Sequence, residues 1–257
     1  MFAEERLLRI VAMVNKLGKA TVAELSESLA VSSVTIRRDL ERLDQEALLI
    51  RTHGGAMALQ NNKLEITQEK SFSEKEEAFA VEKERIAEAA SKLVNDGDAV
   101  LLTPGTTNMR LARMLIGKKE LTLVTNAANI VTHIGSESGI DIILTGGKLR
   151  NKSYAMVGPL ADQALSGIRV DKLFLGIDGF DFNEGLTTPN LAEANTNRQM
   201  ISIAKKVIVV ADHSKFGKVT FSQIAPINVV HTVISDHLLP LDVADKIRGL
   251  GIELILC

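Results

Sequence analysis

One run of residues near the N-terminus constrains the fold of this chain more than any other part of its sequence. Residues 32–40 read Ser-Ser-Val-Thr-Ile-Arg-Arg-Asp-Leu, and residues 51–55 read Arg-Thr-His-Gly-Gly. At about 100° per residue, the apolar side chains of the first run and its continuation fall on one side of a helix: Ile36, Leu40 and Leu43. Hydroxyl and basic side chains fall roughly opposite: Thr35, Arg38 and Arg42. The run therefore predicts a short helix with one side for packing and one basic side for a partner.

Signals for helix ends divide the residues around this run into short elements. Ser32 or Ser33 can cap the predicted helix by accepting hydrogen bonds from the free amides of its first turn. Thr21 and Glu24 have the spacing of a capping box, which predicts an earlier helix start. The break at Ala30 then separates two short helices, as a helix-turn-helix requires.

The flanking residues complete the outline of a winged helix-turn-helix. A longer helix is predicted over residues 3–17, ended by Gly18. Two short strands are predicted at residues 48–50 and 56–58, with Gly54 and Gly55 turning the chain between them. A module of this kind places its second helix in the major groove of DNA, so we expect DNA binding. The expected contacts are Ser33, Thr35, Arg37, Arg38, Arg42, Arg51, His53 and Gly54.

Bulk charge does not explain how such a module would hold DNA. Residues 1–60 contain eight Lys or Arg and eight Asp or Glu, and the whole chain has a formal net charge of −2. Affinity must then come from positive groups gathered on one face and from two copies of the module. Two other interpretations are a solvated arginine face and a winged helix that contacts protein. The combination of turn, cap, wing and basic face favours DNA.

Length and composition indicate the number of domains and the cellular compartment. The 257 residues are 46% hydrophobic and 24% charged, which suits one small and one medium-sized domain. The single cysteine, Cys257, leaves no disulfide within the chain, as expected in a reducing cytoplasm. The N-terminus is charged and lacks the long apolar run of a signal peptide or membrane span. We expect a cytoplasmic protein without a membrane partner.

Residues 59–79 differ from what precedes and follows them. They are polar and charged with few apolar anchors, which predicts an interdomain linker with room for a short element around Phe72. We therefore expect a DNA-binding domain over residues 3–58, this linker, and a larger domain over residues 80–257.

From residue 80 onward, helical and apolar-strand patterns alternate. Short apolar strands between helices predict a mostly parallel sheet covered on both faces, so the fold class is α/β. Strands are expected at residues 99–102, 121–125, 140–144, 172–177, 207–211, 230–235 and 252–256. Helices are expected to start near residues 80, 107, 128, 160, 191 and 241.

Ligands of such a sheet bind beyond the carboxyl ends of its strands, where polar or glycine-rich residues recur in this chain. The helix start at residues 105–107 offers amides, hydroxyls and a positive helix end for a phosphate. Lysines add positive charge, and amide or carboxylate oxygens suit sugar hydroxyls. Each signal alone is equally a turn, a cap or a surface lysine, but together they predict a site for a small anionic polyol. The candidates are Gly105, Thr106, Thr107, Asn126, Gly146, Gly147, Lys148, Asp178, Glu193 and Lys215.

These motifs together resemble the DeoR family of bacterial transcriptional regulators. Residues 3–58 resemble its winged helix-turn-helix, in the recognition run and in the wing over residues 51–56. Residues from about 80 to the end resemble its sensor domain in an ordered set of short motifs. They are Gly97-Asp98, Gly105-Thr106-Thr107, Val124-Thr125-Asn126, Thr145-Gly146-Gly147, Phe174-Leu175-Gly176, Gly185-Leu186-Thr187-Thr188, and Asp212 with Ser214-Lys215-Phe216-Gly217.

The resemblance implies a sequence-specific DNA-binding transcriptional regulator, usually a repressor of a carbohydrate-catabolic operon. Such a repressor leaves its double-stranded operator when a phosphorylated sugar binds, and the resemblance implies neither cofactor nor metal. It also implies a homo-oligomer, a dimer or a tetramer, because paired half-sites are read by paired modules. Residues 178–194 look like the amino-sugar and hexitol branches of the family. Two departures bear on the ligand: Thr103-Pro104 before the glycine, and Asn197-Arg198 after Glu193.

An alternative function follows from the same domain, because the sensor fold is similar to ribose-5-phosphate isomerase. Residues 105–107, 178–181 and 211–215 match three elements of that enzyme's pattern. Isomerisation needs a carboxylate base placed by the bound phosphate, and Glu193 is the nearest candidate. The enzyme's glycine- and lysine-rich loop is not recognisable in residues 183–190. We therefore expect binding without turnover, rather than an isomerase-like enzyme fused to a DNA-binding module.

Overall fold

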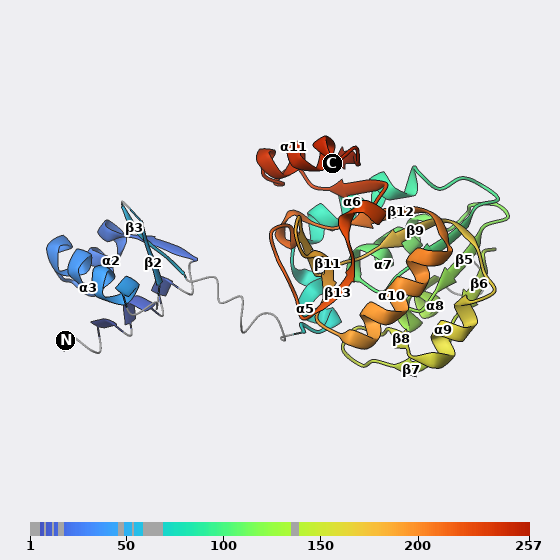
Figure 1. Cartoon of the computed structure of the whole chain (residues 1–257), viewed down its shortest axis with the longest axis horizontal. Helices are drawn as coiled ribbons and strands as arrows, with labels where there is room; N and C mark the ends of the chain where they lie inside the picture. Colours follow the sequence, from blue (N-terminus) through green and yellow to red (C-terminus); the bar gives the residue numbers. More distant parts are fainter. Residues whose placement is uncertain are drawn as a thin grey trace. The chain divides into compact units, whose positions relative to one another are not determined.

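The computed structural model divides the chain into two compact units, residues 1–62 and residues 63–257 (Figure 1). Each unit has a hydrophobic core built from its own residues. No helix in the described part of the chain is long and apolar enough to cross a membrane. The structure describes residues 6–7, 9–11, 13–14, 18–45, 49–52, 54–58, 69–134 and 139–257.

The first unit is a winged helix-turn-helix. Its described residues between 6 and 14 are helical, and two short helices follow: α2 (Val22–Leu29) and α3 (Ser33–Gln45). Three strands form an antiparallel sheet in the order β1-β3-β2: β1 (Lys19–Thr21), β2 (Leu49–Thr52) and β3 (Gly55–Ala58). Strands β2 and β3 are the wing.

The hydrogen bonds at the helix ends confirm the caps predicted for this unit. Thr21 Oγ1 accepts from the amide of Glu24 at 3.2 Å, and the Glu24 carboxylate accepts from the amide of Thr21 at 2.7 Å. Ala30 ends α2 in the left-handed conformation, with φ of 52°. Ser32 Oγ then caps α3 by accepting from the amide of Thr35 at 3.2 Å. The turn between the two helices is therefore short. The left-handed Ala30 ends α2 on one side of it, and the Ser32 cap starts α3 on the other.

Strand β1 was not predicted from the sequence, and it explains why Gly55 is a glycine. A Cβ atom at Gly55 would lie 2.1 Å from the carbonyl oxygen of Ala20, so a larger residue would push β3 away from β1. Gly55 pairs with Thr21 in that ladder. The sequence placed Gly55 in the turn, but it belongs to the strand that follows the turn.

The second unit contains a seven-stranded parallel sheet in the order β15-β14-β12-β9-β4-β5-β6 (Figure 1). Neighbouring residues along its strands belong to two different core clusters, so both faces of the sheet are covered. This confirms the predicted mostly parallel α/β fold. The strands are β4 (Ala99–Leu102), β5 (Thr122–Thr125), β6 (Asp141–Leu144), β9 (Val170–Leu175), β12 (Ala204–Val210), β14 (Thr232–Ser235) and β15 (Glu253–Leu256).

Helices pack on both faces of this sheet. One core cluster takes side chains from α6 (Ala80–Ser91), α7 (Thr106–Met114) and α8 (Ala128–Ile134). The other takes side chains from α9 (Pro159–Leu165), α10 (Leu191–Ile203) and α11 (Leu241–Gly249). Two short 3-10 helices follow β12 and β13: His213–Lys215 and Ile227–Val229.

Smaller elements lie beside the sheet, and of these the sequence analysis expected only the one around Phe72. Helix α5 (Phe72–Glu77) is the short element around Phe72, but residues 69–79 belong to the second unit instead of to the linker. A hairpin joins β7 (Lys148–Leu149) to β8 (Met156–Val157). A small antiparallel sheet in the order β10-β11-β13 comprises β10 (Gly179–Asp181), β11 (Gly185–Thr188) and β13 (Ser222–Ala225).

Candidate functional site

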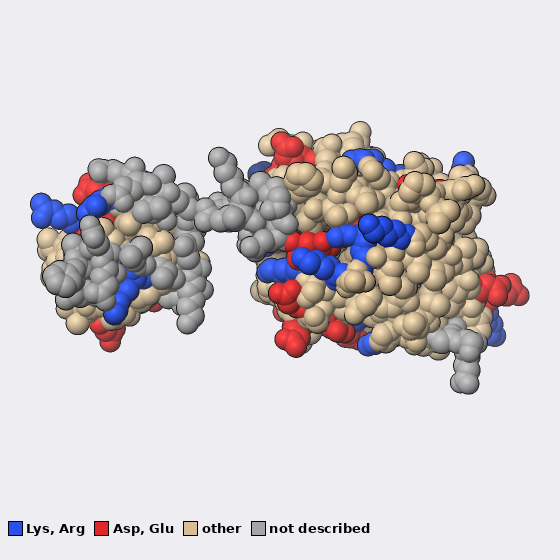
Figure 2. Space-filling view, turned by 90° about the horizontal axis from the view of Figure 1, so that it is seen from below, with Lys and Arg blue, Asp and Glu red and all other residues tan. Residues whose placement is uncertain are grey.

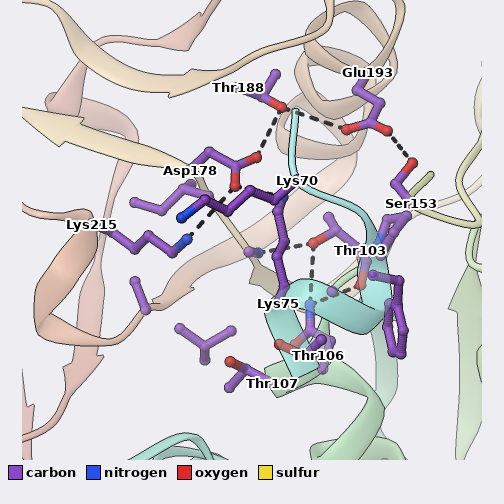
Figure 3. A pocket seen from close by; sticks show the side chains of 18 of the residues that line it. Lys70, Lys75, Thr103, Thr106, Thr107, Ser153, Asp178, Thr188, Glu193 and Lys215 are labelled. Atoms are coloured by element: carbon purple, nitrogen blue, oxygen red, sulfur yellow. Dashed lines mark hydrogen bonds and ion pairs between the residues drawn. The ribbon is translucent and has the colours of Figure 1, made fainter. Parts of the chain in front are cut away.

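A pocket opens at the carboxyl ends of β4, β5, β9 and β12 (Figure 3). The loops after these strands supply much of its wall, and α5 and α6 contribute lysine side chains. The space between these groups, with the open mouth of the pocket included, is about 810 Å³. Residues far apart in the chain thus meet at one edge of the sheet.

The start of α7 lies in the wall of this pocket. Gly105, the N-cap residue, has a φ of 147°, and no side chain caps the helix. The first amides of a helix have no partner within the helix, and they stand at the positive end of its dipole. Thr106 and Thr107 add two hydroxyls to the pocket wall beside them. This helix start therefore suits an anion such as a phosphate.

Five lysines line the same pocket: Lys70, Lys75, Lys83, Lys152 and Lys215. Lys83 is only 4% exposed, and its amine donates to the backbone carbonyls of Lys75 and Ala78, at 2.6 Å to Ala78. Burial lowers the pKa of Lys83 to about 8, although the charge of Asp212 acts in the opposite direction. An anion among these amines would gain charge-assisted hydrogen bonds.

Asp178 follows β9 and lies between two of these lysines. Its Oδ1 is 2.7 Å from Lys75 Nζ and 3.7 Å from Lys215 Nζ, and its Oδ2 accepts from the Thr188 hydroxyl at 3.4 Å. Burial by itself would raise the pKa of Asp178, but the two lysines hold it below its ordinary value. The carboxylate therefore stays ionised and can accept hydrogen bonds from a ligand.

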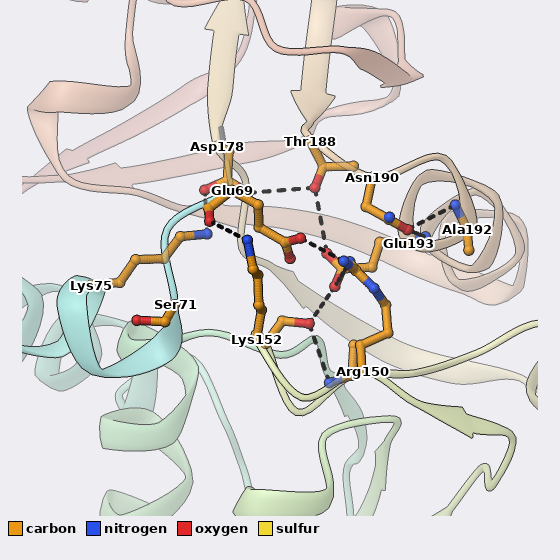
Figure 4. A network of polar contacts seen from close by, with 12 residues as sticks. Glu69, Ser71, Lys75, Arg150, Lys152, Asp178, Thr188, Asn190, Ala192 and Glu193 are labelled. Carbon is orange, nitrogen blue, oxygen red and sulfur yellow. Dashed lines mark hydrogen bonds and ion pairs between the residues drawn. The ribbon is translucent and has the colours of Figure 1, made fainter. Parts of the chain in front are cut away.

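Glu193, in the first turn of α10, is the centre of a second polar network (Figure 4). Its Oε1 accepts from Arg150 Nη1 at 2.6 Å and from the Ser153 hydroxyl, and Arg150 also pairs with Glu69 at 2.5 Å. Burial raises the pKa of Glu193, while Ser153 and Arg150 act in the opposite direction. These partners hold the carboxylate in one orientation at the pocket wall.

Two buried amide oxygens in the pocket wall have no partner among the described residues: Asn108 Oδ1 and Asn126 Oδ1. Each of these side chains is 1% exposed. The amide nitrogen of Asn126 donates to the carbonyl of Met156 at 2.9 Å, which fixes the side chain. Because an unmade hydrogen bond of a buried acceptor costs about 1–3 kcal/mol, a ligand hydroxyl placed here would be stabilised.

Thr103, in one of the two departures from the family pattern, lies in the pocket wall. Its hydroxyl oxygen accepts from the amide of Gly176 at 2.9 Å and from Asn108 Nδ2 at 3.1 Å. The side chain therefore joins the loops after β4 and β9. In this chain its role is to hold the pocket wall together.

Seven of the ten candidate residues line this pocket: Gly105, Thr106, Thr107, Asn126, Asp178, Glu193 and Lys215. The structure does not bring Gly146, Gly147 and Lys148 into its wall. A Cβ atom at Gly147 would lie 2.8 Å from the carbonyl of Val157, so this glycine allows close backbone packing. Lys148 is exposed in β7. These three are residues of the β7–β8 region, and the earlier assignment to the ligand is corrected.

Sequence analysis missed the basic residues that other segments bring to the pocket: Lys70, Lys75, Lys83 and Lys152. One signal was present for Lys83. It lies three, four and seven residues before Ile86, Ala87 and Ala90, and all four are buried on one side of α6. A lysine within the apolar stripe of an amphipathic helix indicates a buried amine that needs partners. No comparable pattern marks Lys75, which lies in a charged run.

In the first unit, the candidate DNA contacts lie on α3 and the wing. Ser33, Arg37, Arg38 and Arg42 are exposed on α3, and Thr35 Oγ1 lies 2.9 Å from Ser32 Oγ. A helix-turn-helix uses the N-terminal part of this helix to reach base edges. Arg37 and Arg38 lie in the N-terminal half of α3, whereas Arg42 lies in its last turn.

The wing residues are more constrained. Arg51 is exposed and its guanidinium lies 3.3 Å from the Glu41 carboxylate on α3. The Gly54 carbonyl accepts from the amide of Val22 at 2.9 Å, which ties the turn of the wing to α2. His53 lies outside the described residues. Arg51 must therefore exchange an exposed ion pair for any phosphate contact, which is a small cost.

Two residues of the recognition run have roles that the sequence did not reveal. Asp39 is 9% exposed and pairs with Arg6, at 2.6 Å and 3.1 Å, so it joins α3 to the helix before α2. Val34, in the first turn of α3, is 71% exposed. An exposed aliphatic group at this position of a recognition helix suits contact with a thymine methyl.

Figure 2 shows a group of Lys and Arg side chains on the visible face of the second unit, with Asp and Glu side chains beside it. Basic and acidic side chains are interspersed there, and most of the remaining visible surface of the second unit is uncharged. This agrees with the net charge of −2. Any affinity for DNA must therefore come from the particular groups on α3 and the wing.

Comparison with known proteins gives matches over nearly the whole chain. A family model described as a DeoR-like helix-turn-helix domain matches residues 6–62, and one described as a DeoR C terminal sensor domain matches residues 78–237. An uncharacterized HTH-type transcriptional regulator of Bacillus subtilis, YulB, is 39% identical over 92% of this chain and 90% of its own length. The glycerol-3-phosphate regulon repressor of Escherichia coli K12 is 32% identical over 96% of both chains.

Solved structures give weaker likenesses. Ribose 5-phosphate isomerase A from Methanocaldococcus jannaschii overlaps 53% of this chain and 54% of its own, at 18% identity and a TM-score of 0.39. A likeness of this size carries no conclusion about activity.

Proposed function

The chain belongs to the DeoR family of DNA-binding transcriptional regulators, and from this premise we propose that it represses a carbohydrate-catabolic operon and leaves its operator when a small phosphorylated sugar binds. The observation that carries the proposal is the pocket of the second unit. It combines a helix start and lysines with carboxylate and amide oxygens. One end suits a phosphate and the other end suits hydroxyls.

The phosphate is proposed to lie at the start of α7. The first-turn amides, with the hydroxyls of Thr106 and Thr107, would donate to its oxygens. Lys215 would supply a positive charge from the loop after β12. A phosphate has three acceptor oxygens and close to two negative charges at neutral pH, so amides, hydroxyls and amines together match it.

The sugar hydroxyls are proposed to lie against the carboxylates and amide oxygens. Asp178 and Glu193 can each accept from hydroxyls, and Asn126 has an acceptor oxygen without a partner in the described structure. An amino sugar would fit the same acidic wall, because its ammonium group also donates. This supports the amino-sugar or hexitol branch as the first place to search.

At the DNA, two copies of the first unit are proposed to read two half-sites. The basic residues on α3 and the exposed Val34 would contact the major groove, and the wing would contact the backbone. The homo-oligomer, dimer or tetramer, sets the spacing between the two recognition helices. Binding of the sugar phosphate favours an arrangement in which that spacing is lost.

One experiment tests the ligand and the response together. The panel consists of glucose 6-phosphate, glucosamine 6-phosphate, sorbitol 6-phosphate, ribose 5-phosphate, glycerol 3-phosphate and inorganic phosphate. We expect at least one sugar phosphate to raise the melting temperature of the purified protein and to release it from its own promoter DNA in a gel shift. A panel in which no sugar phosphate does either would refute the proposal.

The enzymatic alternative is less well supported by the arrangement of the carboxylates. Glu193 is held by Arg150 and Ser153, and Asp178 is paired with lysines. A general base for isomerisation needs a carboxylate free to remove a proton from carbon. We therefore propose binding without turnover, and incubation with ribose 5-phosphate should yield no ribulose 5-phosphate above background.

A further inference from the structure

Residues 69–79, here called the α5 segment, lie beside the pocket and enter the second unit directly after the connection from the first unit. Helix α5 has no buried side chain, whereas every other α-helix in the described part of this unit has at least two. Phe72 is only partly buried against the core. Little apolar burial therefore holds this segment in place.

Polar contacts attach the α5 segment to the rest of the unit instead. Glu69 pairs with Arg150 at 2.5 Å, and the amide of Phe72 donates to the carbonyl of Lys152 at 2.7 Å. Arg110 donates to the carbonyl of Glu76 at 3.2 Å. Such contacts can be exchanged for others at small net cost, unlike the packing of a core. The segment is thus suited to a second position.

Another of these attachments ends in the pocket itself. Lys75 Nζ lies 2.7 Å from Asp178 Oδ1, and Lys83 donates to the carbonyls at the end of α5 (Figure 3). The side chains of Lys75 and Asp178 are 25% and 18% exposed, so a ligand can reach both. Asp178 is at the same time 3.7 Å from Lys215. One carboxylate therefore balances two lysines at the place proposed for the ligand.

We propose that Lys75 binds the anionic group of the ligand, and that its exchange from Asp178 to this group moves the α5 segment and so reports occupancy to the DNA-binding unit. The inference rests on the proposed function, since it assigns a further residue and a regulatory step to the same pocket. A phosphate attracts Lys75 and Lys215 and repels Asp178, while the sugar hydroxyls can donate to Asp178. The ion pair is thereby replaced by two contacts to one ligand.

The consequence for regulation follows from the order of the chain. Residues 59–68 connect the first unit to the α5 segment, and no other covalent connection joins the two units. If the α5 segment moves, the end of this connection in the second unit therefore moves with it. The anchor Glu69–Arg150 stands at that entry, and neither of its residues lines the pocket (Figure 4). The anchor is needed to pass on the displacement. Because Arg150 also holds Glu193 in the pocket wall, release is compared at saturating ligand.

The test uses the full-length protein, three variants and the sugar phosphate from the panel that stabilises the wild type most. Lys75→Met removes the amine and keeps most of the side-chain volume. Glu69→Gln breaks the anchor outside the pocket. Lys205→Met is the matched control, because it removes another lysine–aspartate pair of the same length, 2.7 Å to Asp171, at the start of β12.

Binding and release are measured separately, by calorimetry and by gel shift. We expect Lys75→Met to weaken sugar-phosphate binding about tenfold or more, since a charge-assisted contact is lost. At saturating sugar phosphate, this variant should stay on the DNA. At saturating sugar phosphate, the operator affinity of Glu69→Gln should change at least about fivefold less than that of the wild type, although its pocket is occupied. Lys205→Met should match the wild type in both measurements.

Amide hydrogen exchange measures directly whether the α5 segment responds to the ligand. Amides of residues 69–79 should exchange at a rate that differs by about fivefold or more with the sugar phosphate present, while amides of α11 stay unchanged. Wild-type release from DNA by both Lys75→Met and Glu69→Gln would overturn the inference and leave the proposed function standing. So would exchange in residues 69–79 that does not respond to bound ligand. If no sugar phosphate in the panel binds the wild type, the proposed function fails, and this inference fails with it.

Discussion

At the scale of single residues, each unit depends on charged side chains whose partners are known from the structure. Arg38 on α3 is exposed, and the neighbouring Asp39 is occupied by Arg6. Two adjacent residues of one motif thus differ, since Arg38 is open to a partner and Asp39 joins α3 to another helix. In the pocket the same division holds between Lys75, which a ligand can reach, and Lys83, which is buried.

We expect Arg38→Ala to weaken operator binding by about 1–3 kcal/mol, because a bidentate contact to a guanine edge is lost. Fluorescence titration of operator DNA at one fixed salt concentration measures this. Arg38→Lys is the matched variant, since it keeps the positive charge but loses the paired N–H donors of the guanidinium. Full affinity of the lysine variant would place Arg38 on a phosphate, and full affinity of both variants would remove it from the interface.

Val34 allows a test on the DNA side. We expect Val34→Ala to weaken binding by about 1 kcal/mol, as an apolar contact with one thymine methyl is lost. Replacing each thymine of the operator by uracil should weaken wild-type binding at one position of each half-site and leave Val34→Ala unaffected there. Equal sensitivity of both proteins at every position would show that Val34 reads no methyl group.

The pKa of Lys83 predicts how the affinity for a sugar phosphate depends on pH. Its pKa of about 8 means that the amine carries its charge below pH 8 and loses it above. The charged groups that act on it are Asp212, Lys215, Arg110 and Lys75. A bound phosphate favours the protonated amine, so affinity should fall about tenfold between pH 7 and pH 9. The phosphate itself is already dianionic over this range.

The control for this prediction is Lys83→Met, whose affinity should be lower and almost independent of pH. Calorimetric titrations at four pH values are sufficient. A wild-type affinity that stays constant from pH 7 to pH 9 would show that Lys83 does not sense the ligand. Burial of the charged amine also costs folding stability at neutral pH, and this cost is relieved as the pH rises from about 8 toward the unfolded value.

At the scale of elements, function depends on where helices begin. Helix α3 begins at a serine cap and presents its first turn to solvent, while α7 begins at a glycine and presents its first turn to the pocket. A side-chain cap satisfies the first amides of α3 internally. The absence of such a cap at α7 leaves its amides for a ligand.

Gly105→Ala tests the start of α7. No atom lies within 4 Å of an added Cβ, but a φ of 147° is strained for alanine. The backbone should relax, turn the amides and weaken sugar-phosphate binding by about 1–3 kcal/mol. Gly97→Ala is the control, since Gly97 has a φ of 79°, equal free space and no place in the pocket wall. Equal loss of affinity in both variants would indicate general destabilisation instead.

At the scale of the whole molecule, two units with separate cores must act as one regulator. The first unit has balanced charge, so one copy gains little from counterion release. Once one copy of a pair is bound, the binding of the second copy to its half-site is intramolecular. This raises the apparent affinity without new contacts. The oligomer is therefore part of the proposed DNA-binding mechanism.

Full-length protein should bind a duplex with two half-sites about 100-fold or more tighter than a duplex with one, because pairing raises the effective concentration. Analytical ultracentrifugation of the same samples gives the oligomeric state. Equal affinity for both duplexes would mean that a single copy of the first unit reads the DNA.

Much of the fold could be predicted from the sequence because its signals are local. The capping box of Thr21 and Glu24 and the apolar stripe of Ile36, Leu40 and Leu43 are each contained in a few turns of helix. All seven strands of the parallel sheet were marked by short apolar runs. Strand β1 was missed, because three residues carry too little pattern.

The candidate site was predicted in part, for an equally physical reason. The carboxyl ends of parallel strands lie at one edge, so Gly105, Asn126, Asp178 and Lys215 could be brought together by topology alone. Gly147 obeys the same rule, but the chain turns there into the β7–β8 hairpin and away from the pocket. Position at a strand end does not fix where a loop goes next.

By itself, the sequence determined the main helices, the seven strands of the parallel sheet and the family to which the chain belongs, since these follow from spacing over short stretches. Only the tertiary structure decided that Lys75 and Lys83, from a charged run and a buried helix stripe, share a pocket with Asp178. The physical reason is that partner choice for a charge depends on distance in space, which local periodicity does not encode.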